Sequence, residues 1–214
     1  MKVDRARRRL LAGAALTLGG LPFGAALAAT GDGDRAKAID RVEAYLNGIE
    51  TLSAEFLQVG PNGEIALGKM YLRRPGRLRF EYAPPSPLLL VADGLWLILH
   101  DKELGQVDRF PLSQTPLGVL VDEQVDLRDK VEVVEVEQGP GLLRLLMIDR
   151  KQPDEGWLSI TFTQPPLLLR QWRVKDAQGG ITSVSLTNIR LNRELDPELF
   201  TFIKGCPSHR TQRR

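Results

Sequence analysis

The segment from Gly68 to Asp93 constrains the fold more strongly than any other part of the sequence. It alternates apolar and polar residues on both sides of Pro75-Gly76, then passes through a proline-rich corner into a third, apolar run. This pattern is typical of antiparallel strands joined by tight turns. Because side chains alternate across a strand, Met70 and Leu72 share a face with Arg74.

The strand after the turn repeats the pattern, with Leu78, Phe80 and Tyr82 on one face and charged residues on the other. If the apolar sets face inward, Arg74 lies at the inner rim of an apolar surface. An unpaired buried charge is very costly, so its guanidinium must find hydrogen-bond acceptors. Arg74 is therefore the first candidate for a functional residue.

The rest of the pattern predicts about ten or eleven strands joined by short turns, which favours one strongly curved antiparallel sheet. The runs at 88–91, 95–99 and 167–169 are apolar on both faces, so these strands need cover on both sides. A packed core and a ligand cavity both fit this pattern, because sequence alone cannot separate a filled interior from an empty one.

Two helices are expected besides the sheet. Apolar spacing predicts one that starts at Asp32 or Asp34, either of which can serve as the N-cap, and runs to about Gly48. The pair Thr115-Pro116 fits the N-cap and first position of a short second helix that ends near Asp122. This second helix is apolar almost all round, so it should lie over an apolar surface.

The first 28 residues have the form of a secretory signal peptide. They contain a basic start, an apolar run too short to span a membrane, and the cleavage site Ala26-Leu27-Ala28. Arg7-Arg8-Arg9 also fits a twin-arginine export motif. The expected organisation is a cleaved segment at 1–28, a single folded domain at 29–204 and a disordered basic tail at 205–214.

Charge and cysteine content narrow the function classes. The chain has a net charge of +2, of which residues 1–28 contribute +4, so the remainder carries −2 and gives no sign of nucleic-acid binding. Cys206 is the only cysteine, which excludes an intrachain disulfide, and no cysteine stands at the cleavage site to carry a lipid. We therefore expect an exported, released and soluble monomer.

The sequence gives little support for catalysis. The two histidines lack metal-ligand spacing, and a nucleophile pair of Cys206 and His209 has nothing to orient the base. Hydrolase elbow, phosphate-binding loop and dinucleotide-binding motifs are missing. The expectation is a protein that is not an enzyme, has no metal site or cofactor, and does not need Cys206.

Six short motifs, taken together and in this order, carry a family resemblance. They are LSAEFLQ at 52–58, GKMYLRRP at 68–75, LRFEY at 78–82, VADG at 91–94, TPL at 115–117 and DPELF at 196–200. With them the chain resembles the periplasmic outer-membrane lipoprotein carrier family, LolA, from Asp34 to Phe202.

The resemblance implies a mainly β fold with some α: an unclosed antiparallel β-barrel covered by a lid of short helices, with a hydrophobic cavity between. It also implies a periplasmic carrier that binds the acyl chains of outer-membrane lipoproteins. Such a carrier receives its cargo from an inner-membrane ABC-type transporter and passes it to an outer-membrane lipoprotein receptor.

Site residues follow from the same resemblance. The arginine that latches the lid in this family precedes the proline after the second strand, and it corresponds to Arg74. The lid itself is expected from the first helix and the helix that begins at Pro116. The positions expected to line the cavity are all apolar, namely Met70, Leu72, Leu78, Phe80, Leu90, Trp96, Ile98 and Leu117.

Two departures and two alternatives accompany this interpretation. The segment after Phe202 is short for a C-terminal strand and tail, and leucines stand where some members carry aromatic residues. A lipid- or lipoprotein-sensing binding protein of the same fold is one alternative, although the second domain or membrane segment typical of a sensor is missing. The other alternative, an extracytoplasmic hydrolase, lacks a nucleophile constellation.

Overall fold

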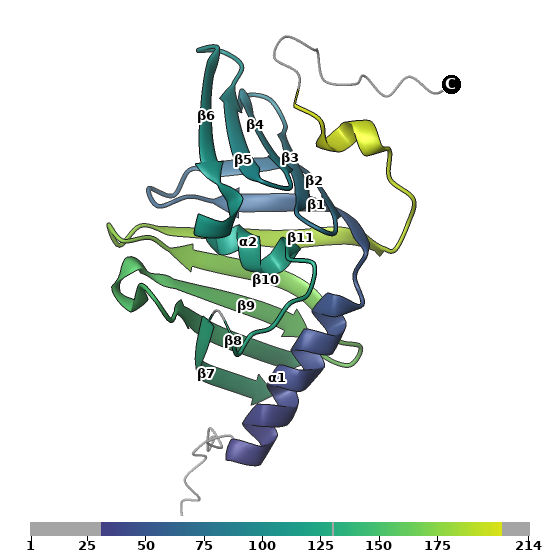
Figure 1. Cartoon of the computed structure of the whole chain (residues 1–214), viewed down its shortest axis with the longest axis vertical. Coiled ribbons are helices and arrows are strands. Elements are labelled where there is room, and N and C mark those ends of the chain that lie inside the picture. The colour runs from purple at the N-terminus through teal and green to yellow at the C-terminus, as the bar shows by residue number, and fades with distance from the viewer. Residues whose placement is uncertain (1–30, 130, 203–214) are drawn as a thin grey trace, which may run out of the picture.

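The structure is a computed structural model that describes residues 31–129 and 131–202. One antiparallel sheet of eleven strands dominates it, in the order β6-β5-β4-β3-β2-β1-β11-β10-β9-β8-β7 (Figure 1). Because β6 and β7 are its two edges, the sheet is not closed, which confirms the predicted fold class. The strands are β1 (Thr51–Val59), β2 (Ile65–Arg73), β3 (Arg77–Tyr82), β4 (Leu88–Asp93), β5 (Trp96–Asp101), β6 (Gln106–Pro111), β7 (Val131–Gly139), β8 (Leu142–Asp149), β9 (Trp157–Thr163), β10 (Leu168–Lys175) and β11 (Ile181–Leu191).

Short turns explain why the strands follow one another across the sheet. The turn between β4 and β5 is at Asp93-Gly94: Gly94 adopts a positive φ of 112°, and the Asp93 carboxylate accepts hydrogen bonds from the backbone N–H groups of Leu95 and Trp96. The pairing of β1 with β11 is the one neighbour pair that joins strands far apart in sequence. It brings the two halves of the chain into a single sheet.

The helical elements are α1 (Asp32–Asn47), η1 (Leu112–Gln114), α2 (Pro116–Val121), η2 (Pro153–Glu155) and η3 (Pro197–Phe200). Thr115 and Pro116 occupy the N-cap and first position of α2, as predicted. The predicted N-cap of α1 is wrong by one position or more, because Gly31 is the N-cap and makes no side-chain cap. Asp32 and Asp34 lie in the first turn instead, where their negative charges interact favourably with the positive end of the helix dipole.

Both α-helices lie on the same side of the sheet (Figure 1). α1 crosses the β7–β10 half, and α2 lies in front of the middle strands. We call this the inner face and the opposite side the outer face. The apolar core lies at the inner face and draws residues from α1, from α2 and from most strands; its largest fully buried side chains include Leu46, Leu78, Leu145, Ile160 and Phe162.

A second, smaller apolar cluster lies on the outer face. It contains Leu89, Val91, Ile98 and Phe200, all at least 92% buried, and these four are separate from the main core. Phe200 comes from η3, which packs against β3 and β4. Strand β4, which is apolar on both faces, therefore receives cover on both faces.

Several predictions fall outside the described residues. These are the signal peptide at 1–28, the tail at 205–214, Cys206 and His209. Within the described residues, no helix has both the length and the apolar character needed to cross a membrane. The same residues contain no group of three or more His, Cys, Asp or Glu side chains placed to hold a metal ion.

Candidate functional site

The inner surface of β2, β3 and β4 brings together most of the predicted apolar residues. The strand register sets Met70 opposite Phe80 and Phe80 opposite Leu90, and it sets Leu72 opposite Leu78. Directly opposed residues share a face, so these five side chains form one surface. Four of them are 5% exposed or less, and Leu90 is partly buried against the core.

Aromatic rings extend this surface across the strands. Phe56 packs edge-on against Phe80 and Tyr82 with ring centroids 5.0 and 5.1 Å apart, and Phe80 meets Trp172 at 6.1 Å. The Phe56 ring lies over Gly68, where a Cβ atom would approach it to 2.6 Å. Phe56 and Trp172 are not among the residues predicted from the sequence to line the site. The alternation of Leu52, Ala54 and Phe56 with polar residues could have indicated that Phe56 faces inward. Trp172 lies on β10 and comes close to Phe80 only because the sheet curves, which no local pattern in the sequence reveals.

The covering elements fill the space above this surface. We define the lid as α1, η1, α2 and the connecting residues 122–129. Its apolar side chains Leu120, Val121, Val125 and Leu127 are all 4% exposed or less and belong to the same core as the strand residues. In this conformation the interior is therefore occupied by the protein's own side chains. Leu117 also lies on α2, but its side chain is outside the described part of the structure.

Arg74 joins the β2–β3 turn to the lid. Its Nη1 donates to the carbonyl oxygen of Asp122 and its Nη2 to that of Leu120, both at 2.7 Å. The backbone N–H of Gly76 donates to the carbonyl between them, that of Val121, also at 2.7 Å. Three consecutive carbonyls at the end of α2 thus accept hydrogen bonds from one turn. Cationic side chains and N–H donors stabilise the end of a helix, because its last carbonyls have no hydrogen-bond partner within the helix.

The environment of Arg74 is not fully complementary to its charge. Burial lowers the pKa of its guanidinium, and the nearby Asp122 carboxylate opposes that effect. Its Nε is buried and has no hydrogen-bond partner among the described residues. A buried donor without a partner costs about 1–3 kcal/mol. The closed arrangement therefore combines two good hydrogen bonds with one unsatisfied group.

The prediction that Trp96 and Ile98 line the same surface is wrong. Ile98 pairs with Val91, which pairs with Arg79 on the outer face, and Trp96 lies two residues along the same strand. Both therefore point away from Leu78 and Phe80. They line a separate open pocket of about 690 Å³ on the outer face, together with Phe200 and other residues of the C-terminal segment.

Comparison with known proteins decides the family. The family model described as "Outer membrane lipoprotein carrier protein LolA" matches residues 47–203. The chain belongs to the LolA family. An outer-membrane lipoprotein carrier protein from Chromobacterium violaceum is 30% identical over 177 residues, which cover 78% of this chain and 84% of the relative.

Other relatives of the LolA-family chain agree with this assignment. An outer-membrane lipoprotein carrier protein from Halorhodospira halophila is 30% identical over 178 residues, covering 78% of this chain and 82% of the relative. Among solved structures, an uncharacterized conserved protein from Thermus thermophilus overlaps 80% of this chain and 95% of its own, with a TM-score of 0.49 and 13% identity. This structural likeness is too low to add to the family assignment.

Proposed function

We propose that the chain is a periplasmic carrier that binds the acyl chains of outer-membrane lipoproteins and delivers them to the outer membrane. The carrier has no catalytic step. It receives cargo from an inner-membrane ABC-type transporter, releases it to an outer-membrane receptor, and acts as a monomer. Residues 1–28 are a signal peptide that is removed on export, and residues 29–204 form the carrier domain. Family membership supports the cargo class.

The occupied interior supports this proposal because it limits how tightly cargo is held. An acyl chain gains about 0.8 kcal/mol for each CH₂ group moved from water into an apolar site. A permanently empty cavity would bind several chains too tightly for delivery. When Leu120, Val121, Val125 and Leu127 fill the same space, their burial competes with the cargo and lowers its net affinity.

The hydrogen bonds between Arg74 and the lid are the main structural support for the proposal. Each of its hydrogen bonds joins a charged donor to a lid carbonyl, and such bonds contribute roughly 1.5–3 kcal/mol. They exist in the closed conformation, so they oppose the lid opening that cargo binding requires. The unsatisfied Nε offsets part of this stabilisation and so lowers the free energy needed to open the lid.

The test is a two-step transfer assay with Arg74→Leu. Loss of the two hydrogen bonds should favour the open lid, so the variant should still accept lipoprotein from inner-membrane vesicles. Its delivery to receptor-bearing membranes should fall by about tenfold or more, since 1.4 kcal/mol corresponds to a factor of ten. Arg74→Lys should be intermediate, because a lysine ammonium cannot engage two carbonyls in a fixed fork.

Two outcomes contradict the proposal in different ways. Delivery by Arg74→Leu at the unsubstituted rate would mean that Arg74 is a structural arginine rather than a latch. Purification of the tagged chain from periplasm with free lipid and no acylated protein, as judged by mass spectrometry, would favour the lipid-sensing alternative and overturn the carrier role itself.

A further inference from the structure

Within the lid, the chain from residue 112 to residue 129 is held at two separate places. The η1–α2 segment, residues 112–121, is held at its end by the β2–β3 turn through Arg74 and Gly76. The segment that follows, residues 125–129, is held by α1 instead. These two sets of contacts share no residue, so one can be lost while the other persists.

Asn47 and Glu43 make the second attachment. The Asn47 side chain forms a reciprocal pair with the backbone of Val125: Nδ2 donates to its carbonyl at 3.0 Å, and Oδ1 accepts from its N–H at 2.8 Å. One turn earlier on α1, the Glu43 carboxylate accepts from the backbone N–H of Leu127 at 2.8 Å and from Arg128 at 2.7 Å. Arg128 also donates to Asp40 at 2.6 Å. Three successive turns of α1 therefore bind one short segment.

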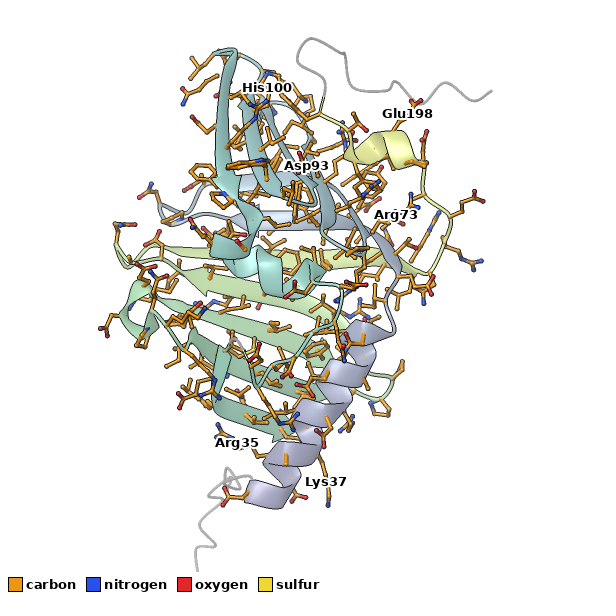
Figure 2. All side chains as sticks on the ribbon, viewed as in Figure 1. Arg35, Lys37, Arg73, Asp93, His100 and Glu198 are labelled. Atoms are coloured by element: carbon orange, nitrogen blue, oxygen red, sulfur yellow. The ribbon has the colours of Figure 1, made fainter. Side chains whose placement is uncertain are left out.

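α1 is in turn fixed to strands of the β7–β10 half. The Tyr45 hydroxyl accepts a hydrogen bond from the backbone N–H of Leu169 on β10 at 3.1 Å, and its ring packs edge-on against Phe162 on β9. Arg35 lies near the start of α1, where Figure 2 labels it. Its guanidinium donates to the carbonyls of Val133 and Val134 on the edge strand β7. Because both ends of α1 are held, residues 125–129 are attached to the least movable part of the lid.

The η1–α2 segment is a compact unit of its own. The backbone N–H and the hydroxyl of Thr115 both donate to the carbonyl of Leu112, at 3.1 and 2.9 Å. Gly118 sits so close to that carbonyl that a Cβ atom would lie 2.6 Å from it. Between this unit and residue 125, Glu123 and Gln124 are exposed, and an open pocket of about 520 Å³ separates them from the end of α1.

We infer that Asn47 and Glu43 are positioning residues that keep residues 125–129 on α1, so that only the η1–α2 segment moves when the lid opens. The chain bends at Glu123 and Gln124 on the C-terminal side of the segment. Its N-terminal end stays joined to β6, where the backbone N–H of Leu112 donates to the carbonyl of Leu95 at 2.9 Å. Opening then exposes the inner surface of β2–β4, and α1 continues to cover the β7–β10 half. This inference deepens the proposed carrier function by assigning the cargo surface to one half of the sheet, but its test needs no cargo.

The experiment measures thiol labelling of the empty mature protein in a Cys206→Ser background. Leu120→Cys reports on the moving segment and Val125→Cys on the fixed one, since both positions are 4% exposed or less. Arg74→Leu should raise the labelling rate at position 120 by about tenfold or more and leave position 125 within about twofold, because two charged hydrogen bonds are lost at one attachment only. Asn47→Ala should have the opposite pattern, and Asn47→Asp, which keeps the acceptor and loses the donor, should be intermediate.

Equal acceleration at both positions by Arg74→Leu would overturn the inference, because it would show a lid that moves as one body. Amide hydrogen exchange on Arg74→Leu without reporter cysteines repeats the test if a reporter variant does not fold. Faster exchange confined to residues 112–121 supports the two-part lid, and faster exchange that includes residues 125–129 refutes it. A carrier that fails in the transfer assay leaves these labelling results unchanged, so the two proposals fail separately.

Discussion

The two faces of the β3–β5 region carry similar apolar side chains and are closed in different ways. The inner face, with Leu78 and Phe80, is covered by a lid that Arg74 holds through backbone carbonyls. The outer face, with Val91 and Ile98, is covered by η3, which places Phe200 directly in the cluster. Both covers accept an arginine hydrogen bond at a main-chain oxygen, from Arg74 on the inner face and from Arg79 on the outer face. The outer cover also inserts a buried aromatic side chain, Phe200.

The two attachments suggest different roles for two faces that are equally buried. A buried aromatic anchor is costly to withdraw, because truncating a buried Phe typically costs about 3–5 kcal/mol. Arg74 contributes roughly 1.5–3 kcal/mol for each of its two charged hydrogen bonds, and its unsatisfied Nε offsets part of that sum. We propose that the lid-covered inner face exchanges cargo and that the outer cluster has a structural role, although both are equally apolar in sequence.

The largest expected effect comes from truncating the same residue type on each face. Phe80 and Phe200 are 2% and 3% exposed, so Phe80→Ala and Phe200→Ala should each lower the free energy of unfolding by about 3–5 kcal/mol. Only Phe80→Ala should also change cargo affinity per folded molecule. Denaturant unfolding and binding of a lipoprotein by the folded fraction measure the two effects. A loss of cargo binding in folded Phe200→Ala would show that the outer cluster also contributes to cargo binding.

A second pair uses one arginine on each side of the sheet, Arg74 and Arg79. Arg79 on the outer face donates to Glu81 at 2.7 Å and to the carbonyl of Leu199 at 3.0 Å, which ties η3 to β3. Arg79→Leu should destabilise the fold by roughly 1.5–3 kcal/mol and leave delivery unchanged. Arg74→Leu should slow delivery but lose less stability, because it also removes the unsatisfied Nε. Equal transfer defects in the two variants would show that loss of any arginine impairs the carrier.

The comparison also shows what the sequence could and could not reveal. The number of strands and the start of α2 at Thr115-Pro116 were predicted because side-chain alternation and capping residues are local signals. The acceptors of Arg74 could not be named, since they are backbone carbonyls 46 and 48 residues away and any residue type has one. Trp96 and Ile98 were assigned to the wrong face because a strand that is apolar on both sides does not indicate which side is inner. That choice is made by the register, which pairs Leu97 with Ala92.

Tyr82 offers a smaller and pH-dependent test of the inner face. Its hydroxyl donates to the side-chain oxygen of Gln58 at 2.8 Å, so Tyr82→Phe should cost about 1 kcal/mol at neutral pH. Burial raises the pKa of Tyr82 above its ordinary value of 10.0. The unfolded chain therefore ionises first, and the stability present below pH 10.0 is lost as the pH rises toward the folded-state pKa. Alkaline denaturation should be shallower in Tyr82→Phe but still present, because burial also raises the pKa of Tyr45 and Tyr71.

The smallest expected effect is at Trp96, where the predicted and observed faces disagree. Its side chain is 44% exposed and lines the outer pocket, so Trp96→Ala should cost less than the truncation of a fully buried aromatic residue. Because the lid covers the other face, the variant should load and deliver lipoprotein at the unsubstituted rates. Leu72→Ala, on the inner face and 5% exposed, is the matched case that should alter cargo affinity. Weaker acyl-chain binding by Trp96→Ala, with Leu72→Ala unchanged, would place the cargo on the outer face and reverse the assignment of the two faces.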